Sequence, residues 1–309
     1  MYETNDITEP TIEEFDIKYT CKTIATALFM MMLIQLVVIF IGAAIIGVNA
    51  SFLSLKATAA LSMVSTVLSS LFVMYRYGRK LSIQLFASKE DSSWGIKKIL
   101  LFSLITIGFS GFFTLGVNLL NMLFQQTGFI MTTPDFSFSF SMEYNIILLV
   151  STCIIAPIFE ELIYRGLILH ALKRFGIHFA VFVTSLLFAL AHGNFIQGIP
   201  TFFMSLLLCY MVLESGSIIT GMIAHFLNNA LGMVETFFLG NQTMSIIFLI
   251  VEVFLMILAM YYLLKHREVF TTIKKQPGDH GTFTFFNNWV SILYLILIVI
   301  SYLGSIMLL

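Results

Sequence analysis

The stretch Thr23–Val48, TIATALFMMMLIQLVVIFIGAAIIGV, runs for 26 residues without a charge. As a helix it would be about 39 Å long at ~1.5 Å per residue, which exceeds the ~30 Å hydrocarbon core of a bilayer. A second uncharged run, Ala57–Tyr75, covers 19 residues and is also close to the length that a membrane requires. Both stretches therefore predict transmembrane helices.

The composition of the whole chain agrees with these two stretches. Of its 309 residues, 59% are hydrophobic and only 11% are charged, whereas about 25% are charged in a typical soluble domain. This excludes a water-soluble domain. The net charge is −1, and no basic patch with interleaved aromatic residues occurs, so we expect no nucleic-acid partner.

The apolar runs predict an all-α, polytopic membrane helix bundle with about nine transmembrane helices. A membrane β-barrel is excluded because its strands would alternate in polarity over about ten residues, whereas these runs are continuously apolar. The nine predicted segments are 23–48, 57–75, 99–122, 144–172, 175–193, 196–213, 217–238, 244–264 and 289–309.

The positions of the basic residues predict the orientation of the bundle. With a cytoplasmic N-terminus, 14 of the 16 Lys and Arg residues fall in inner segments. Only Lys56 falls outside, and Arg165 lies within a span. Because inner loops of membrane proteins are enriched in Lys and Arg, we expect the N-terminus inside and the C-terminus outside.

The chain divides into four regions at this level. Residues 1–22 contain six acidic residues and predict an acidic cytoplasmic tail. Residues 23–143 are expected to hold accessory transmembrane helices and an inner loop. Residues 144–238 form the candidate core, and residues 239–309 form C-terminal transmembrane helices.

Several ionisable and amide side chains fall inside the predicted spans. Such groups cost several kcal/mol (~3 or more) at membrane depth unless they are paired or hydrated, so each is a candidate functional residue. They are Glu160, Glu161 and Arg165 in the fourth span, His192 at the end of the fifth, His225, Asn229 and Glu235 in the seventh, and Glu252 in the eighth.

Helix geometry separates the two adjacent glutamates. Glu161 and Arg165 are four residues apart and face each other across one turn, so we expect a structural ion pair. Glu160 points about 100° away and is left free for chemistry. Pro157 lacks an N–H and should free the carbonyl of Cys153 in an α-helix.

The spacing of the spans also predicts that these polar groups converge. Gly176, in the turn between the fourth and fifth spans, is the midpoint of Glu160 and His192, so the two residues are level in an antiparallel hairpin. His225 and Asn229 lie ~14 and ~20 Å beyond the next inner turn at ~1.5 Å per residue. We therefore expect four polar groups in one layer, in a cavity open to the cytoplasmic side.

These residues resemble three motifs of the CPBP family, the intramembrane proteases typified by type II CAAX prenyl endopeptidases and bacterial abortive-infection (Abi) proteins. The family pattern is Glu-Glu-x-x-x-Arg, then Phe-x-x-x-His, then His-x-x-x-Asn on successive membrane helices. In this chain the motifs read Glu160-Glu161 with Arg165, Phe188 with His192, and His225 with Asn229. The resemblance covers residues 144–238.

The resemblance implies hydrolysis of a peptide bond inside the membrane. By analogy, Glu160 and His192 would activate a water, while Asn229 and His225 would stabilise the oxyanion. Glu161, Arg165 and Phe188 would be structural supports. The substrate would be a membrane-associated peptide or a lipidated protein, and membrane lipids would surround the enzyme, which we place in a bacterial plasma membrane.

Two questions stay open at this stage. No cofactor is favoured, but Glu160, His192 and His225 could in principle form a zinc site with an open position. The alternative functions are a non-catalytic immunity or regulatory protein that binds a partner in the same cavity, and an ion-coupled transporter that uses Glu235 and Glu252. The absence of an internal repeat disfavours the transporter.

Overall fold

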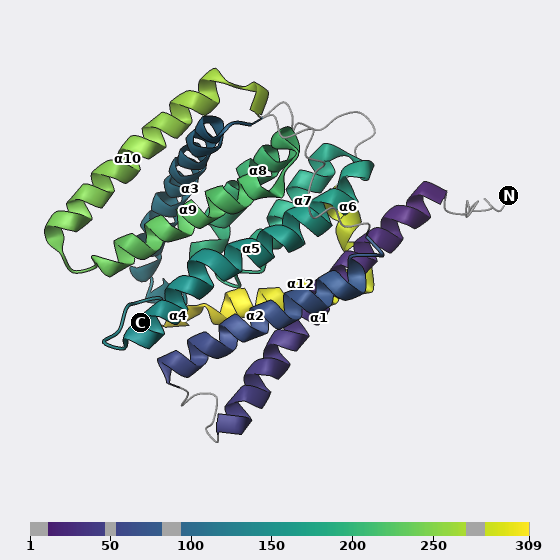
Figure 1. The fold of residues 1–309 in the computed structure, drawn as a ribbon, viewed down its shortest axis with the longest axis horizontal. Coiled ribbons are helices and arrows are strands. Elements are labelled where there is room, and N and C mark those ends of the chain that lie inside the picture. The colour runs from purple at the N-terminus through teal and green to yellow at the C-terminus, as the bar shows by residue number, and fades with distance from the viewer. Residues whose placement is uncertain (1–11, 47–53, 82–93, 270–281, 309) are drawn as a thin grey trace.

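A computed structural model describes residues 12–46, 54–81, 94–269 and 282–308. The chain forms a bundle of packed helices (Figure 1). A continuous helical unit between α3 and α7 covers Met142–Phe175. The other helices are α1 (Ile12–Ile46), α2 (Leu55–Tyr77), α3 (Ile96–Gln125), α7 (Ile177–Leu190), α8 (Phe195–Ser215), α9 (Ile218–Phe237), α10 (Gln242–Lys265) and α12 (Trp289–Gly304).

Short polar residues define where several of these helices begin. The side chains of Ser54, Ser217, Asn241 and Asn288 each accept a hydrogen bond from a backbone N–H in the first turn of α2, α9, α10 and α12, respectively. Such caps satisfy donors that the helix itself leaves unpaired. The apolar runs between the caps then continue as helix because, in lipid, each backbone group needs a partner within its own segment.

Six helical segments within the described residues are long and apolar enough to cross a membrane, and α7 and α12 are shorter apolar helices. Each of the nine predicted apolar runs coincides with a helical segment. The predicted all-α, polytopic architecture is confirmed, and the chain is an integral membrane protein. The count of nine spans and the orientation stay predictions.

The unit that carries Glu160 is not a regular α-helix. It contains two π-helical stretches, in which the backbone bonds span five residues instead of four and which are frequent at functional sites. Along the chain it consists of α4 (Met142–Leu149), π-helical η2 (Val150–Ile155), α5 (Ala156–Glu161), π-helical η3 (Leu162–Leu169), α6 (His170–Leu172) and the 3₁₀ turn η4 (Lys173–Phe175).

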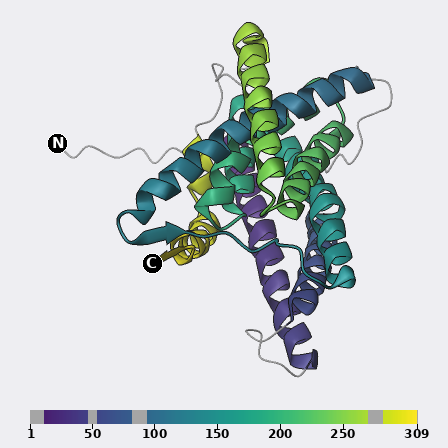
Figure 2. The same ribbon diagram turned by 90° about the vertical axis from the view of Figure 1, so that its left-hand side faces the viewer.

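Packing arranges the helices around this unit. Helix α1 packs against α2 and α12, α3 packs against α8 and α10, and α7 packs against α8. Helix α9 contacts α3, α8 and α5, so it closes the space next to the Glu160 unit. Figure 2 shows α3 and α10 crossing on one side of the molecule, with α12 and the C-terminus beside the end of α3.

The two ends of the chain differ from the sequence predictions. Residues 12–22, predicted as part of an acidic tail, belong to α1, because Ile17 and Cys21 are buried in the core of the bundle. At the other end, the predicted ninth span ends at Gly304, and Ile306–Leu308 forms a strand, β2. It pairs antiparallel with β1 (Phe129–Met131), a small departure from the all-helical architecture.

Three contacts connect segments that the predicted topology places on the same side of the membrane. Lys56 at the start of α2 lies 3.1 Å from Glu143 at the start of α4, and β1 pairs with β2. On the opposite end of the bundle, Arg174 lies 3.0 Å from Asp16. The predicted inner loop 76–98 and connector 265–288 lie partly outside the described residues, at 82–93 and 270–281.

Candidate active site

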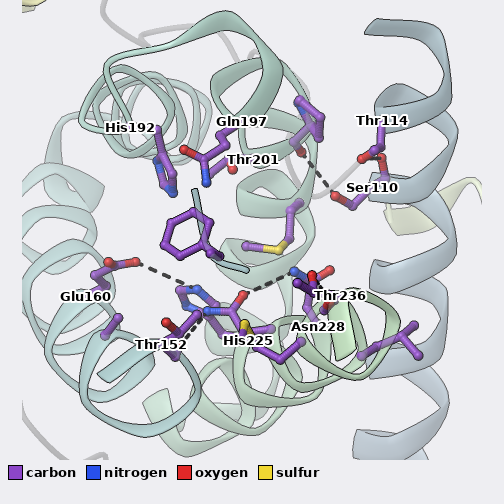
Figure 3. Close-up of a pocket in the computed structure, with 18 of the residues that line it drawn as sticks. Ser110, Thr114, Thr152, Glu160, His192, Gln197, Thr201, His225, Asn228 and Thr236 are labelled. Atoms are coloured by element: carbon purple, nitrogen blue, oxygen red, sulfur yellow. Dashed lines mark hydrogen bonds and ion pairs between the residues drawn. The ribbon is translucent and has the colours of Figure 1, made fainter. Parts of the chain in front are cut away.

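A cavity of about 580 Å³ lies between the Met142–Phe175 unit, α2, α3, α8, α9 and α10. Its walls include Glu160, His192, His225 and Asn229, the four residues predicted to act in catalysis. Figure 3 shows Glu160, His192 and His225 facing this cavity from separate helical segments. The structure therefore brings together all four predicted side chains.

The two adjacent glutamates differ strongly in exposure. The side chain of Glu161 is fully buried and lies 2.8 Å from Arg165 Nη1, across one helical turn as predicted. The side chain of Glu160 keeps 30% of its surface exposed. Glu160 is therefore the carboxylate that a molecule in the cavity can reach, whereas Glu161 is enclosed within the protein.

Arg165 is held by three neighbours inside the bundle. Besides the ion pair with Glu161, its Nη2 donates a 2.7 Å hydrogen bond to Ser205 Oγ on α8. Its guanidinium also lies 4.5 Å from the ring centre of Phe188 on α7, within the range of a cation–π contact. Because burying a charge without partners is costly, this arrangement links η3 to α7 and α8 at one fixed geometry.

His225 extends the buried ion pair toward the cavity. Its Nδ1 lies 3.0 Å from Glu161 Oε1, and since a carboxylate can only accept, Nδ1 carries the hydrogen. Its Nε2 lies 3.7 Å from Glu160 Oε2. The order Arg165–Glu161–His225–Glu160 thus runs from the core of the protein to the cavity and orients the imidazole of His225.

A glycine on α9 makes this contact between helices possible. A Cβ atom at Gly221 would lie 2.7 Å from Glu161 Oε2, closer than real Cβ contacts. The same position would also be 3.1 Å from Val212 on α8. Gly221 therefore leaves the space into which the carboxylate of Glu161 fits against α9.

The end of α7 positions His192. The helix stops at Leu190, and Gly193 adopts a left-handed conformation with φ of +67°. Because the last carbonyls of a helix lack backbone partners, the Phe188 carbonyl is free to accept a 2.9 Å hydrogen bond from His192 Nδ1. Asn194 caps α8 and donates to the His192 carbonyl at 2.9 Å. The other ring nitrogen of His192, Nε2, is left as an acceptor.

Asn229 is anchored by a carbonyl of the π-helical turn. Its Nδ2 donates a 2.9 Å hydrogen bond to the carbonyl of Thr152. In η2 the Ala156 N–H bonds to Ser151 O, five residues earlier, so Pro157 is the residue that would otherwise donate to Thr152. The sequence prediction named the carbonyl of Cys153, which follows from α-helical spacing, and the π-helical turn shifts the acceptor by one residue.

The segment that carries these four side chains is similar to a known protein family. Residues 142–231 match a family model described as type II CAAX prenyl endopeptidase Rce1-like. We refer to residues 142–231 as the Rce1-like segment because of this similarity. The predicted family resemblance is confirmed, and the match contains all three motifs. No curated protein and no solved structure matches the chain.

The Rce1-like segment does not supply the whole site. Ser62 and Thr66 of α2, Ser110 and Thr114 of α3 and Glu252 of α10 also line the cavity, and all five lie outside residues 142–231. Figure 3 shows Ser110 and Thr114 on the wall opposite Glu160. The flanking helices therefore complete a polar cavity around the residues of the segment.

Glu235 and Glu252, predicted as the acids of an alternative transporter, line the same cavity. They come from α9 and α10, at a part of the wall that lies outside the Rce1-like segment. The structure thus places these two acids and the motif residues around one cavity.

The expectation that no cofactor is required, with zinc as its alternative, stays a prediction. Within the described parts of the chain, no three side chains of His, Cys, Asp or Glu converge in a way that could hold a metal ion. Nδ1 of His192 is bound to a carbonyl and Nδ1 of His225 to Glu161, which orients both rings and leaves their Nε2 atoms available, as in metal-ligating histidines as well.

The sequence reasoning missed several residues that shape the site. Ser205 holds Arg165, Thr152 holds Asn229, and Gly221 makes room for Glu161. The cap of α8 was also missed, although it had a recognisable signal: Asn194 followed by Gln197 is similar to a capping box at the start of a helix. Gln197 N donates to Asn194 Oδ1 at 2.9 Å. The others contact residues of distant helices and leave no local pattern.

Proposed function

We propose that the protein is an intramembrane endopeptidase that hydrolyses a peptide bond in a membrane-associated peptide or lipidated protein. One observation carries the proposal: Glu160, His192, His225 and Asn229 line a single cavity, and all four belong to the Rce1-like segment. We place the protein in a bacterial plasma membrane with the cavity open to the cytoplasmic side, and the distribution of Lys and Arg supports the orientation of the spans.

In this proposal Glu160 and His192 hold the attacking water. The Nε2 of His192 is an acceptor because Nδ1 donates to Phe188 O, and the carboxylate of Glu160 is an acceptor as well. A water that donates one hydrogen to each directs its lone pair toward the carbonyl carbon of the substrate. As the C–O bond forms, the proton of the water passes to Glu160, which acts as general base.

Asn229 and His225 face the oxygen that becomes negative. The amide of Asn229 has two N–H groups, and only one of them is needed for the hydrogen bond to Thr152 O. The second N–H would donate to the oxyanion of the tetrahedral intermediate, together with the Nε2–H of His225 as an imidazolium whose other N–H is held by Glu161. When the C–N bond breaks, the proton held by Glu160 moves to the departing amine, which restores the carboxylate.

The experiment that tests this proposal uses the full chain in proteoliposomes with a defined pool of synthetic peptides, some of them lipidated. Mass spectrometry would identify cleaved bonds for the wild type, Glu160→Gln and His192→Ala. We expect both substitutions to lower the cleavage rate about 10²- to 10⁴-fold, the usual contribution of a general base. The proposal is wrong if cleavage continues unchanged in both variants.

A matched substitution separates the protease from the transporter. Glu252→Gln removes a carboxylate from the same cavity and leaves Glu160, His192, His225 and Asn229 in place. Peptide cleavage should stay within about twofold of the wild type, since every group proposed to act in the transition state is kept. Chelation followed by metal analysis of active protein would test the expectation of a metal-independent reaction.

A further inference from the structure

A second, smaller chamber lies on the other side of Glu160 and His192. It has a volume of about 300 Å³ and is lined by residues of α1, α2, η3, α7 and α12. Glu160 and His192 line both spaces. The two proposed reacting groups are therefore shared between the larger cavity and this smaller chamber.

The walls of the smaller chamber are mostly apolar. Met31 and Met32 of α1 and Leu297 and Ile298 of α12 belong to them, and both helices lie outside the Rce1-like segment. Among the described residues of the lining, Glu160 and His192 are the acidic or basic side chains, and no Asp, Lys or Arg is present. A charged ligand would find no counterion here apart from the reacting carboxylate, so the chamber suits an uncharged, apolar group.

Most polar side chains in the walls already have partners within the protein. Gln35 donates to Ser69 at 3.3 Å, Thr66 donates to the Ser62 carbonyl at 3.0 Å, and Ser301 donates to the Gly193 carbonyl at 3.1 Å. These groups are therefore used for packing one helix against another or for satisfying the backbone.

Tyr164 is different. Its side chain lines the chamber and is only 1% exposed, yet its hydroxyl has no hydrogen-bond partner among the described residues. Leaving a buried hydroxyl without a partner costs about 1–3 kcal/mol. The ring itself is fixed by an edge-to-face contact with Phe188 at 4.8 Å. The hydroxyl thus belongs to a fixed ring in the lining that also contains Glu160 and His192, and no described residue accepts its hydrogen.

We propose that this chamber is a substrate subsite: it takes the apolar side chain of a residue next to the scissile bond, and Tyr164 donates a hydrogen bond to a backbone carbonyl of that residue. The inference rests on the proposed peptidase function and adds its specificity-determining residues. A volume of about 300 Å³ is at the lower end of small-ligand sites and accommodates one side chain but not a folded segment. In this arrangement α1 and α12, outside the Rce1-like segment, select the substrate.

The first test measures binding without requiring cleavage. The probe is the photoreactive residue analogue N-acetyl-p-benzoylphenylalanine methylamide, added to the full chain in proteoliposomes, with labelled peptides mapped by mass spectrometry. Labelling is expected on residues of α1 or α12 that line the chamber. It should fall about 3- to 10-fold in Tyr164→Phe, the effect of one neutral hydrogen bond.

A bulky substitution with a matched control tests the chamber itself. Leu297→Trp places a large ring into the chamber, whereas Ile296→Trp places the same ring on a neighbouring position of α12 that is 50% exposed. Labelling should fall at least fivefold in the first variant and stay near the wild-type level in the second. The inference is overturned if both variants behave alike, or if labelling is confined to residues of the larger cavity.

The second test uses the cleaved peptides and distinguishes the inference from the proposed function. In Leu297→Trp, cleavage should shift toward peptides with small residues beside the scissile bond. In Tyr164→Phe, KM should rise about 3- to 10-fold with kcat unchanged. A fall in kcat alone would assign the hydroxyl to the reacting water and overturn the subsite. Absence of any cleavage together with specific labelling would instead reject the peptidase and retain the binding chamber.

Stability supplies the remaining control. Tyr164→Phe removes a hydroxyl that has no partner, so the unfolding temperature should be unchanged or higher. Tyr302→Phe removes a hydroxyl that donates to the Ala189 carbonyl at 2.8 Å, so it should lower the unfolding temperature. A large loss of stability in Tyr164→Phe would show that the hydroxyl has a structural partner and would contradict the proposal.

Discussion

Helix α10 and the π-helical turn η3 are both apolar, but they relate to their surroundings in opposite ways. In α10, three of 24 residues are buried, and side chains such as Ile250 and Phe254 are more than 60% exposed. In η3, seven of eight residues are buried, including Arg165. The exposed surface of α10 therefore needs only to be apolar enough for lipid, whereas almost every position of η3 is in contact with other parts of the protein.

The difference shows where the identity of a residue matters in this membrane protein. An apolar side chain that faces lipid gains little from one shape over another, because lipid tails are as apolar as the side chain. A charged or amide side chain in the interior cannot form hydrogen bonds with bulk water, so it depends on groups from other helices. Substitutions in the two regions should accordingly have very different effects.

The largest loss is expected from breaking the buried ion pair. Glu161→Gln leaves Arg165 without its counterion and weakens the contact to His225, and removing one partner of a buried pair costs about 3–5 kcal/mol. Thermal unfolding in detergent micelles would measure this loss. Lys56→Gln breaks an exposed pair and should cost less than about 1 kcal/mol. Equal losses would show that the interior of η3 is as tolerant as the periphery.

Gly221→Ala tests the close approach of α9 to Glu161. The added methyl would displace the carboxylate, so we expect a loss of about 1–3 kcal/mol from overpacking and at least tenfold slower peptide cleavage. Gly232→Ala is the matched change on the same helix, where a Cβ would meet nothing within 4 Å. That variant should be neutral or slightly stabilised, because alanine favours the helix. Similar behaviour of the two variants would rule out the close contact.

Asn229→Ala removes both a proposed oxyanion donor and the partner of the Thr152 carbonyl. The orphaned carbonyl should lower the free energy of unfolding by about 1–2 kcal/mol, and cleavage should slow about 10²-fold or more. Asn228→Ala is the control, since Asn228 donates only a 3.3 Å hydrogen bond to Asn229. Rate measurements for the two variants that agree within a factor of two would count against a role for Asn229.

The smallest effect separates two equally conservative changes. Ile163→Val removes one methylene group from a side chain of η3 that is 1% exposed, and should cost about 0.5–1.5 kcal/mol. Ile250→Val removes the same group from α10, where the side chain is 62% exposed, and should change stability by less than about 0.5 kcal/mol. The difference between their unfolding temperatures measures the contrast between interior and periphery directly.

The sequence allowed the helices and the motif residues to be predicted, but not the contacts between them. The spacing of Glu161 and Arg165 predicts their ion pair. The equal distance of Glu160 and His192 from the turn at Gly176 predicts that these two residues lie at the same depth. The contact of His225 with Glu161 was not predicted, because it joins residues 64 positions apart on separate helices. The acceptor of Asn229 was also missed, since a π-helical turn changes the hydrogen-bond register without a clear signal in the residues around Pro157.

The sequence by itself determined that the protein lies in a membrane, and it identified the rare polar side chains within the apolar runs. Long uncharged runs can exist only where lipid replaces water, and a Glu or His within such a run requires a partner or a use. Only the tertiary structure decided which partners those groups have. It showed that Glu161 is enclosed by Arg165 and His225, that Glu160 lines two chambers, and that the Tyr164 hydroxyl has no hydrogen-bond partner among the described residues. Those assignments depend on how distant helices pack, because burial and distance are set by neighbours that the local sequence does not specify.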